Sequence, residues 1–284
     1  IGHRHILPFY SHMSGGQYLL GDYDTVRQKF IVTNHGNFNF GPSGPAGVHA
    51  PSATPDGSGG VIIIFNMNPG MRTEGWNQIM SLPRRLSLIS EDKIGIEPAG
   101  EIESLRYSHK EISAMTLPAN KEVVLQDIQG NAMEILAVID PGEAPMVELN
   151  LLRSPGKEEY TSIQIQTERG YGDGREYWET RGIPRERKPR PTLVSLHTTH
   201  SSELPGAYSR IPETAPVQIG RNEPVKLRIF IDKSIVEVFV NGRQCIAARV
   251  YPGRDDSLGV SLRSQGKESQ LILLDAWQMK NIYD

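Results

Sequence analysis

Carboxylates and histidines are the side chains of this sequence that could take part in acid–base or metal chemistry. Asp22 and Asp24 flank Tyr23 and would share one face of a strand, and Glu74 lies in a loop beside a glycine. For the two aspartates we favour solvated or turn-capping roles. The sequence offers Glu74 no second carboxylate with which it could act as a catalytic pair. We therefore predict no catalytic residue among these carboxylates.

The histidines of the chain do not form a metal-binding pattern. Those that lie close together in the sequence are His3, His5 and His12, and His197 and His200. They lack cysteine or carboxylate neighbours at the spacing of zinc ligands. The glycine-rich stretch Gly57 to Gly60 precedes a strand and does not open a helix, so it is no phosphate-binding loop. The sequence therefore predicts no metal and no cofactor.

Composition excludes several classes of partner. The chain has 284 residues, a formal net charge of −3, 38% hydrophobic and 22% charged residues, which is typical of a soluble globular protein. It lacks the positive charge with which proteins bind nucleic acids or anionic membranes. Its long apolar run, Val61 to Phe65, is too short to span a bilayer. We expect no nucleic acid and no membrane as partners. We expect the single cysteine, Cys245, to be a small buried hydrophobic residue.

The clearest structural pattern is a three-stranded stretch near the C-terminus. Apolar residues alternate with other residues from Leu227 to Asp232 and again from Ile235 to Val240, which indicates strands. Asn241 and Gly242 then precede a third run, Arg243 to Tyr251. An Asn-Gly pair suits a type I′ turn, in which both central residues have positive φ. Three consecutive antiparallel strands are predicted.

One carboxylate lies inside this stretch. Glu237 stands between apolar neighbours on a strand, where a carboxylate usually faces solvent or pairs with an arginine. Arg249, across the hairpin, is the arginine that we consider. Glu237 is therefore interpreted as structural and not as catalytic.

Strand patterns also fill the rest of the chain. We predict a hairpin from His5 to Tyr10 and Gln17 to Asp22, a surface loop from Thr33 to Gly47, and a hairpin from Val48 to Pro55 and Val61 to Phe65. Further alternating runs are Ile112 to Leu117, Val123 to Ile128, Met133 to Ile139, Val147 to Leu152, Tyr160 to Gln166 and Thr192 to His197, with a long loop from Tyr171 to Pro191. No convincing amphipathic helix is present. These patterns predict an all-β chain of two domains that meet near residue 106.

Several segments carry motifs of a known enzyme family. Asp232 to Gly242 reads Asp-x-Ser-x-x-Glu-Val-Phe-x-Asn-Gly. This pattern resembles the signature of the C-terminal β-sandwich in glycoside hydrolase family 32, the invertases, inulinases and levanases. The segments Tyr18 to Asp24, Val48 to Asp56 and Trp76 to Leu86 are similar, in order and spacing, to the last blades of its five-bladed propeller. Pro98 to Arg106 looks like the connector that ends the propeller. The resemblance implies a partial β-propeller in residues 1–106 and a β-sandwich in residues 107–284.

The resemblance also implies where the catalytic residues lie. Retaining glycoside hydrolysis needs two carboxyl groups roughly 5 to 5.5 Å apart. The family carries its carboxylates on early blades, in motifs of the Trp-Met-Asn-Asp-Pro-Asn-Gly, Arg-Asp-Pro and Glu-Cys types, and none of these motifs occurs in residues 1–284. The expected function is hydrolysis of β-fructofuranosidic bonds in a longer protein, of which this chain is an inactive C-terminal portion.

Two other functions remain as alternatives. The chain could be a non-catalytic carbohydrate-binding or structural module. A five-bladed relative that acts on arabinans is disfavoured by the signature from Asp232 to Gly242.

Two residues are the expected contacts to a fructose-containing oligo- or polysaccharide. His49 occupies the place of a tyrosine in relatives, and Gly47 the place of their substrate-contacting aspartate. At the inner mouth of a propeller, His49 could donate a hydrogen bond to a sugar hydroxyl. Trp76 matches a residue near the pocket rim, where an indole could stack on a sugar. Packing of Trp76 between blades is the alternative.

Overall fold

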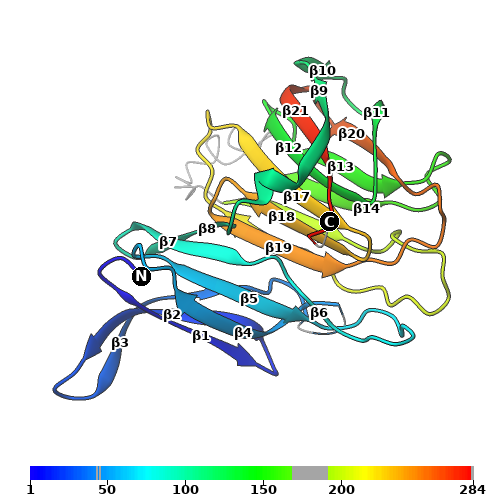
Figure 1. Ribbon diagram of the computed structural model, residues 1–284. Coiled ribbons are helices and arrows are strands. Elements are labelled where there is room, and N and C mark those ends of the chain that lie inside the picture. Colours follow the sequence, from blue (N-terminus) through cyan, green and yellow to red (C-terminus); the bar gives the residue numbers. More distant parts are fainter. Residues whose placement is uncertain (43, 45, 168–190, 283–284) are drawn as a thin grey trace, which may run out of the picture.

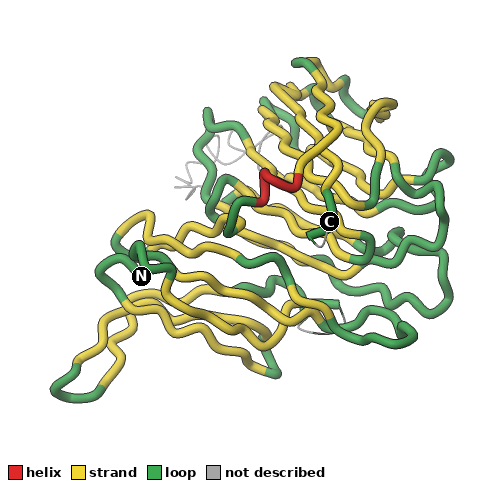
Figure 2. The backbone as a smooth tube through the Cα atoms, viewed as in Figure 1, coloured by secondary structure: helices red, strands yellow, loops and turns green. Residues whose placement is uncertain are grey.

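The computed structural model describes residues 1–42, 44, 46–167 and 191–282 of the chain (Figure 1). Within these residues almost all regular structure is antiparallel strand, and one short 3₁₀ helix, η1 (Ile102–Leu105), follows the last strand of the N-terminal part (Figure 2). The all-β prediction is confirmed. The loop predicted from Tyr171 to Pro191 lies, except for Pro191, outside the described residues.

Two small sheets make up the N-terminal part of the chain. The first contains β1 (His5–Ser11), β2 (Gly15–Asp24) and β3 (Lys29–Asn37), in that order. The second contains β4 (Val48–Pro55), β5 (Val61–Met67), β7 (Arg84–Ser90) and β8 (Lys93–Pro98), with the short β6 (Ile79–Met80) paired to β5. The β1–β2 and β4–β5 hairpins are those predicted from the sequence.

The predicted surface loop from Thr33 to Gly47 is wrong in its first five positions. Thr33 to Asn37 belong to β3, which pairs along β2. β3 lies at the edge of its sheet and none of its residues is buried. Such a strand has no buried face, so it lacks the alternation by which strands are recognised.

Two larger sheets form the C-terminal part. A seven-stranded sheet contains β9 (Arg106–Ile112), β10 (Met115–Leu117), β12 (Ala132–Asp140), β17 (Val225–Asp232), β18 (Ile235–Val240), β19 (Gln244–Arg249) and β21 (Ser269–Met279). A six-stranded sheet contains β11 (Glu122–Gln129), β13 (Met146–Arg153), β14 (Thr161–Gln166), β15 (Thr192–His197), β16 (Glu213–Val217) and β20 (Gly259–Gln265). Alternate side chains of both sheets form one buried core, in which Ile135 and Val238 from the first sheet join Leu149, Ile163 and Leu262 from the second.

Most of the predicted strands in this part are present. The run from Ile112 to Leu117 is an exception, because β9 ends at Ile112 and β10 begins at Met115. Both strands nevertheless pair with β21, so the interruption at Ser113 and Ala114 lies within one sheet.

The β18–β19 turn has the backbone expected of an Asn-Gly pair. Asn241 has φ 50° and Gly242 has φ 62°, and the Arg243 N–H donates to the Val240 carbonyl over 2.9 Å. Val240 pairs in register with Gln244, so the loop contains three residues and β19 begins one residue later than predicted. The Gly242 carbonyl also accepts the N–H of Ile96 in β8 over 2.9 Å. The turn thereby contacts the N-terminal part.

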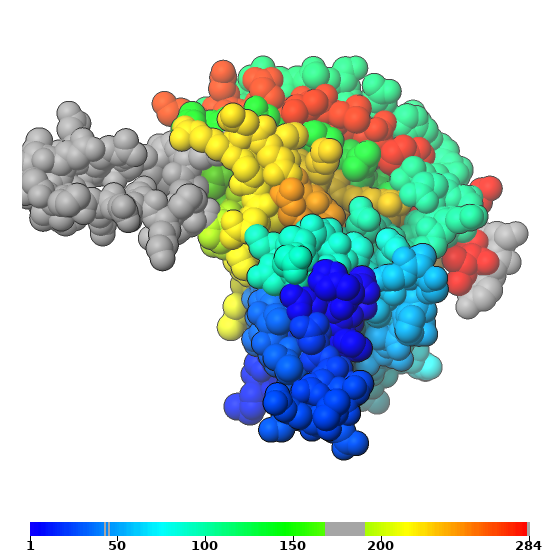
Figure 3. Space-filling view, turned by 90° about the vertical axis from the view of Figure 1, so that its left-hand side faces the viewer, coloured from blue at the N-terminus to red at the C-terminus, as the bar shows by residue number. Residues whose placement is uncertain are grey.

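A second core joins the N-terminal sheets to the outer face of the seven-stranded sheet. Apolar residues of the N-terminal part, among them Phe65 and Ile96, lie in one buried cluster with Phe230, Phe239 and Cys245 of the C-terminal part. Figure 3 shows the two parts in direct contact, with the N-terminal residues in blue and cyan packed below the C-terminal ones. The part of the seven-stranded sheet formed by β17, β18 and β19 is therefore covered on both faces.

Replacing Gly242 by valine should destabilise the protein. A β-branched residue at φ 62° carries a conformational cost of about 1–3 kcal/mol. The midpoint of urea unfolding should fall accordingly. Gly220→Val is the matched control, because Gly220 is exposed, lacks a positive φ, and leaves an added Cβ at an ordinary 3.6 Å from the Glu223 Cβ. Equal midpoints for the two variants would contradict the turn geometry.

Cys245 should be unreactive in the folded protein. The side chain is 1% exposed, and burial raises the pKa of its thiol to about 12. The thiolate, which is the nucleophile, is then absent near neutral pH. A disulfide reagent such as Ellman's should modify the thiol only after addition of denaturant. Complete modification of the folded chain within seconds would show that Cys245 is not buried.

Candidate functional site

His49 lies where the two N-terminal sheets meet. It is the second residue of β4, and its ring contacts Tyr10 of β1 edge to face, with ring centroids 4.4 Å apart. The Nδ1 atom is buried and has no hydrogen-bond partner among the described residues. An unpaired buried polar atom costs about 1–3 kcal/mol unless water or a ligand supplies the partner. His49 thus has capacity for a further hydrogen bond.

Trp76 lies in the segment between β5 and β6 and is 46% exposed. Its ring centroid is 4.9 Å from the guanidinium carbon of Arg249, and that carbon lies 5.0 Å from the ring centroid of Tyr251. Arg249 also donates from Nη1 to the carbonyl of Asn77 over 3.3 Å. The indole is therefore fixed against the C-terminal part through Arg249, while nearly half of its surface faces solvent.

The structure brings His49 and the Trp76 segment to the same end of the second sheet. In register, Asn66 of β5 stands between His49 and Met80 of β6. The side-chain amide of Asn66 donates to the amide oxygen of Gln78, two residues after Trp76. These groups could form one side of a polar binding surface.

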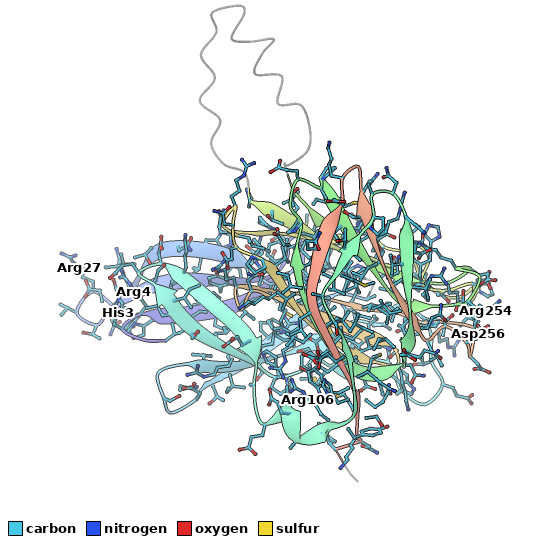
Figure 4. All side chains as sticks on the ribbon, turned by 90° about the horizontal axis from the view of Figure 1, so that it is seen from above. His3, Arg4, Arg27, Arg106, Arg254 and Asp256 are labelled. Atoms are coloured by element: carbon cyan, nitrogen blue, oxygen red, sulfur yellow. The ribbon has the colours of Figure 1, made fainter. Side chains whose placement is uncertain are left out.

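The carboxylates of the first sheet serve the fold. Asp22 forms an ion pair with Arg4. Asp24 accepts the N–H groups of Val26 and Arg27 over 3.0 and 2.9 Å, so its predicted turn-capping role is confirmed. Figure 4 shows Arg4, which precedes β1, and Arg27, in the turn between β2 and β3, at one end of the molecule.

A buried ion pair joins the N-terminal sheets to the C-terminal ones. Arg84 of β7 donates from Nη2 to Oε2 of Glu237 of β18 over 2.8 Å, and their side chains are 0% and 2% exposed. The other oxygen of Glu237 accepts the N–H of Leu82 over 2.6 Å. The guanidinium of Arg84 lies 4.9 Å from the centroid of the Phe65 ring. Both charges are therefore held in place by contacts across the interface.

The prediction that Glu237 faces solvent or pairs with an arginine is confirmed in its second form, because Glu237 pairs with Arg84. The suggested partner, Arg249, is wrong, since Arg249 stands opposite Ile235 in the hairpin, whereas Glu237 stands opposite Ala247. Val236 and Val238 point into the core between the large sheets, so Glu237 points to the other face. That face is covered by the N-terminal sheets. A charge in a strand with no exposed face required a partner in another segment, and the sequence alone does not identify which one.

In the described ranges, no group of three or more His, Cys, Asp or Glu side chains is arranged to hold a metal ion. No helix with the length and hydropathy of a membrane span occurs in the same residues.

The comparisons with known proteins all relate the chain to one enzyme family. Residues 101–278 match the family described as "Glycosyl hydrolases family 32 C terminal". An insoluble isoenzyme of beta-fructofuranosidase from Arabidopsis thaliana is 27% identical over 241 residues, which are 73% of this chain and 40% of the relative. The levanase of Bacillus subtilis is 28% identical over 217 residues, 74% of this chain and 28% of the relative. The chain thus spans well under half of these curated relatives.

Solved structures extend the likeness to the whole chain. Fructan 1-exohydrolase IIa from Cichorium intybus superimposes with a TM-score of 0.81 and 18% identity, covering 98% of this chain and 57% of that one. Exo-inulinase from Aspergillus awamori gives a TM-score of 0.71 at 15% identity, covering 99% and 57%. At such identities the likeness concerns the fold. Because the family match covers more than half of the chain, the chain belongs to glycoside hydrolase family 32. It corresponds to the C-terminal portion of the family's proteins.

Proposed function

We propose that this chain is the C-terminal portion of a β-fructofuranosidase that hydrolyses sucrose-, levan- or inulin-type substrates with retention at the anomeric carbon. The observation that carries the proposal is the family 32 match over residues 101–278. Relatives that bear the names beta-fructofuranosidase and levanase support the substrate class. In this proposal, residues 1–106 are the last blades of a five-bladed propeller, and residues 107–284 are a β-sandwich.

The chemistry of the described carboxylates supports a catalytic pair outside the chain. Retaining hydrolysis requires a nucleophilic carboxylate and an acid/base carboxyl roughly 5 to 5.5 Å apart, with both reaching the sugar. Glu237 is enclosed with Arg84, Asp22 is paired with Arg4, and Asp24 caps a turn. We assign none of these three side chains to the role of nucleophile or to the role of acid/base. In our proposal, the catalytic carboxylates come from residues beyond this chain.

The chain's own contribution would be one wall of the substrate pocket. His49 has an unpaired ring nitrogen, and Trp76 presents an exposed indole fixed by Arg249. A ring nitrogen can hydrogen-bond a sugar hydroxyl, and an indole can cover its apolar C–H face. The substrate would be a fructose-containing oligo- or polysaccharide. A non-catalytic carbohydrate-binding or structural module is the alternative.

The isolated 284-residue chain should release no fructose from sucrose, levan or inulin. Joined to an upstream segment that carries the carboxylate motifs, it should release fructose, and proton NMR of the first product anomer should show retention. Robust release by the chain alone, abolished by changing Asp22, Asp24 or Glu74, would overturn the proposal. An inactive joined protein that still binds sugar would favour the alternative module.

In the active joined protein, Trp76→Ala should raise KM roughly two- to tenfold, because an aromatic contact contributes about 0.5–1.5 kcal/mol. Tyr107→Ala is the matched control, since Tyr107 is 47% exposed and lies in β9 of the C-terminal part. Equal KM values for the two variants would exclude Trp76 from the substrate contacts.

A further inference from the structure

A polar pocket lies on the outer face of the six-stranded sheet. Its volume is about 180 Å³, and its lining includes Glu148, Tyr160, Ser162, Gln164, His197 and His200. These residues come from β13, β14, β15 and the segments that follow β13 and β15. The seven-stranded sheet separates this face from the N-terminal sheets, as Figure 1 shows. The pocket is therefore distinct from the wall formed by His49 and Trp76.

The floor of the pocket contains polar atoms without partners. Ser162 is 3% exposed, and its hydroxyl has no hydrogen-bond partner in the described ranges. His197 stands beside Ser162 in register, and its buried Nε2 also lacks a partner there. Burial lowers the pKa of His197, so its ring is neutral near neutral pH. Two neighbouring groups that can donate or accept hydrogen bonds thus face a cavity, where a bound polar molecule would satisfy them.

The sides of the pocket are held rigidly. Tyr160 and His200 stack with ring centroids 5.0 Å apart and planes 15° apart, and the Tyr160 N–H donates to the His200 carbonyl over 2.8 Å. Glu148 stands opposite Gln164 in register, and its carboxylate accepts a hydrogen bond from Asn150 over 2.8 Å. The pocket therefore presents an oriented carboxylate and an amide beside an aromatic pair.

The chemistry of these groups favours a neutral polyhydroxylated ligand. Sugar hydroxyls both donate and accept, so one ring can satisfy a carboxylate, an amide, a serine hydroxyl and a neutral imidazole together. The carboxylate of Glu148 repels anions, and Lys157, with its Nζ 3.6 Å from that carboxylate, disfavours cations. The volume of about 180 Å³ gives the pocket room for one monosaccharide ring. We propose that this pocket binds one neutral monosaccharide unit, free or at the end of an oligosaccharide.

The proposal can be tested by titrating the 284-residue chain with fructose, glucose and sucrose, followed by saturation-transfer NMR. A small, largely polar pocket should give a Kd on the order of 1 mM for at least one of them. His200→Ala should weaken binding roughly three- to tenfold by removing the stacked ring, and Ser162→Ala should weaken it by roughly threefold or more. Urea midpoints of both variants show whether the fold is kept.

Two controls locate the bound sugar. His109→Ala removes a histidine that is likewise stacked on an aromatic ring, with the ring centroid of Trp277 4.9 Å away and the planes 15° apart, but on the seven-stranded sheet. It should leave the Kd unchanged. Loss of binding in the His200 and Ser162 variants, with binding kept in the His109 variant, supports the pocket. Absence of binding by all three sugars, or binding that survives both pocket variants, overturns it. These outcomes are independent of fructosidase activity, so this proposal and the proposed function can fail separately.

Discussion

The buried ion pair between Arg84 and Glu237 is the interaction on which the arrangement of the two halves depends. Removing two charges from water is costly, and their attraction offsets this cost only where further contacts support them. Here the backbone N–H of Leu82 binds the free oxygen of Glu237, and the ring of Phe65 lies against the guanidinium. Loss of either partner would leave the other charge buried without its counter-ion.

The pair also explains the position of the candidate site. Arg84 begins β7, which follows the Trp76 segment and β6 in the chain, so the pair anchors the chain beyond that segment. Arg249 of β19, the strand next to β18, holds the indole itself. At the other side of the interface, the carbonyl of Gly242 binds β8. The second N-terminal sheet is thus attached to the seven-stranded sheet at several places along its length. Such a fixed attachment suits the proposed role of this sheet as one wall of a binding site.

Local patterns predicted much of the fold, and contacts between distant segments account for what they missed. The alternation from Leu227 to Val240 and the Asn-Gly turn are local, and both are present in the structure. The strand from Thr33 to Asn37 was missed because an exposed edge strand has no buried face. The partner of Glu237 could not be predicted, because Arg84 is 153 residues away and only the folded interface brings the two together. His49 and Trp76 were selected by resemblance. The pocket beside Ser162 could not be predicted from the sequence, because His197 and His200 were considered only as metal ligands and the other lining residues come from separate segments.

A double-mutant cycle at the interface tests this account most directly. Arg84→Met, Glu237→Gln and the double variant would be compared with the unmodified chain by urea unfolding. Each single variant should lose about 3–5 kcal/mol of stability, because each leaves a buried polar partner unsatisfied. The double variant should lose less than the sum, with a coupling free energy on the order of 2 kcal/mol. Additive losses, or single variants with unchanged midpoints, would show that the pair does not hold the two halves together.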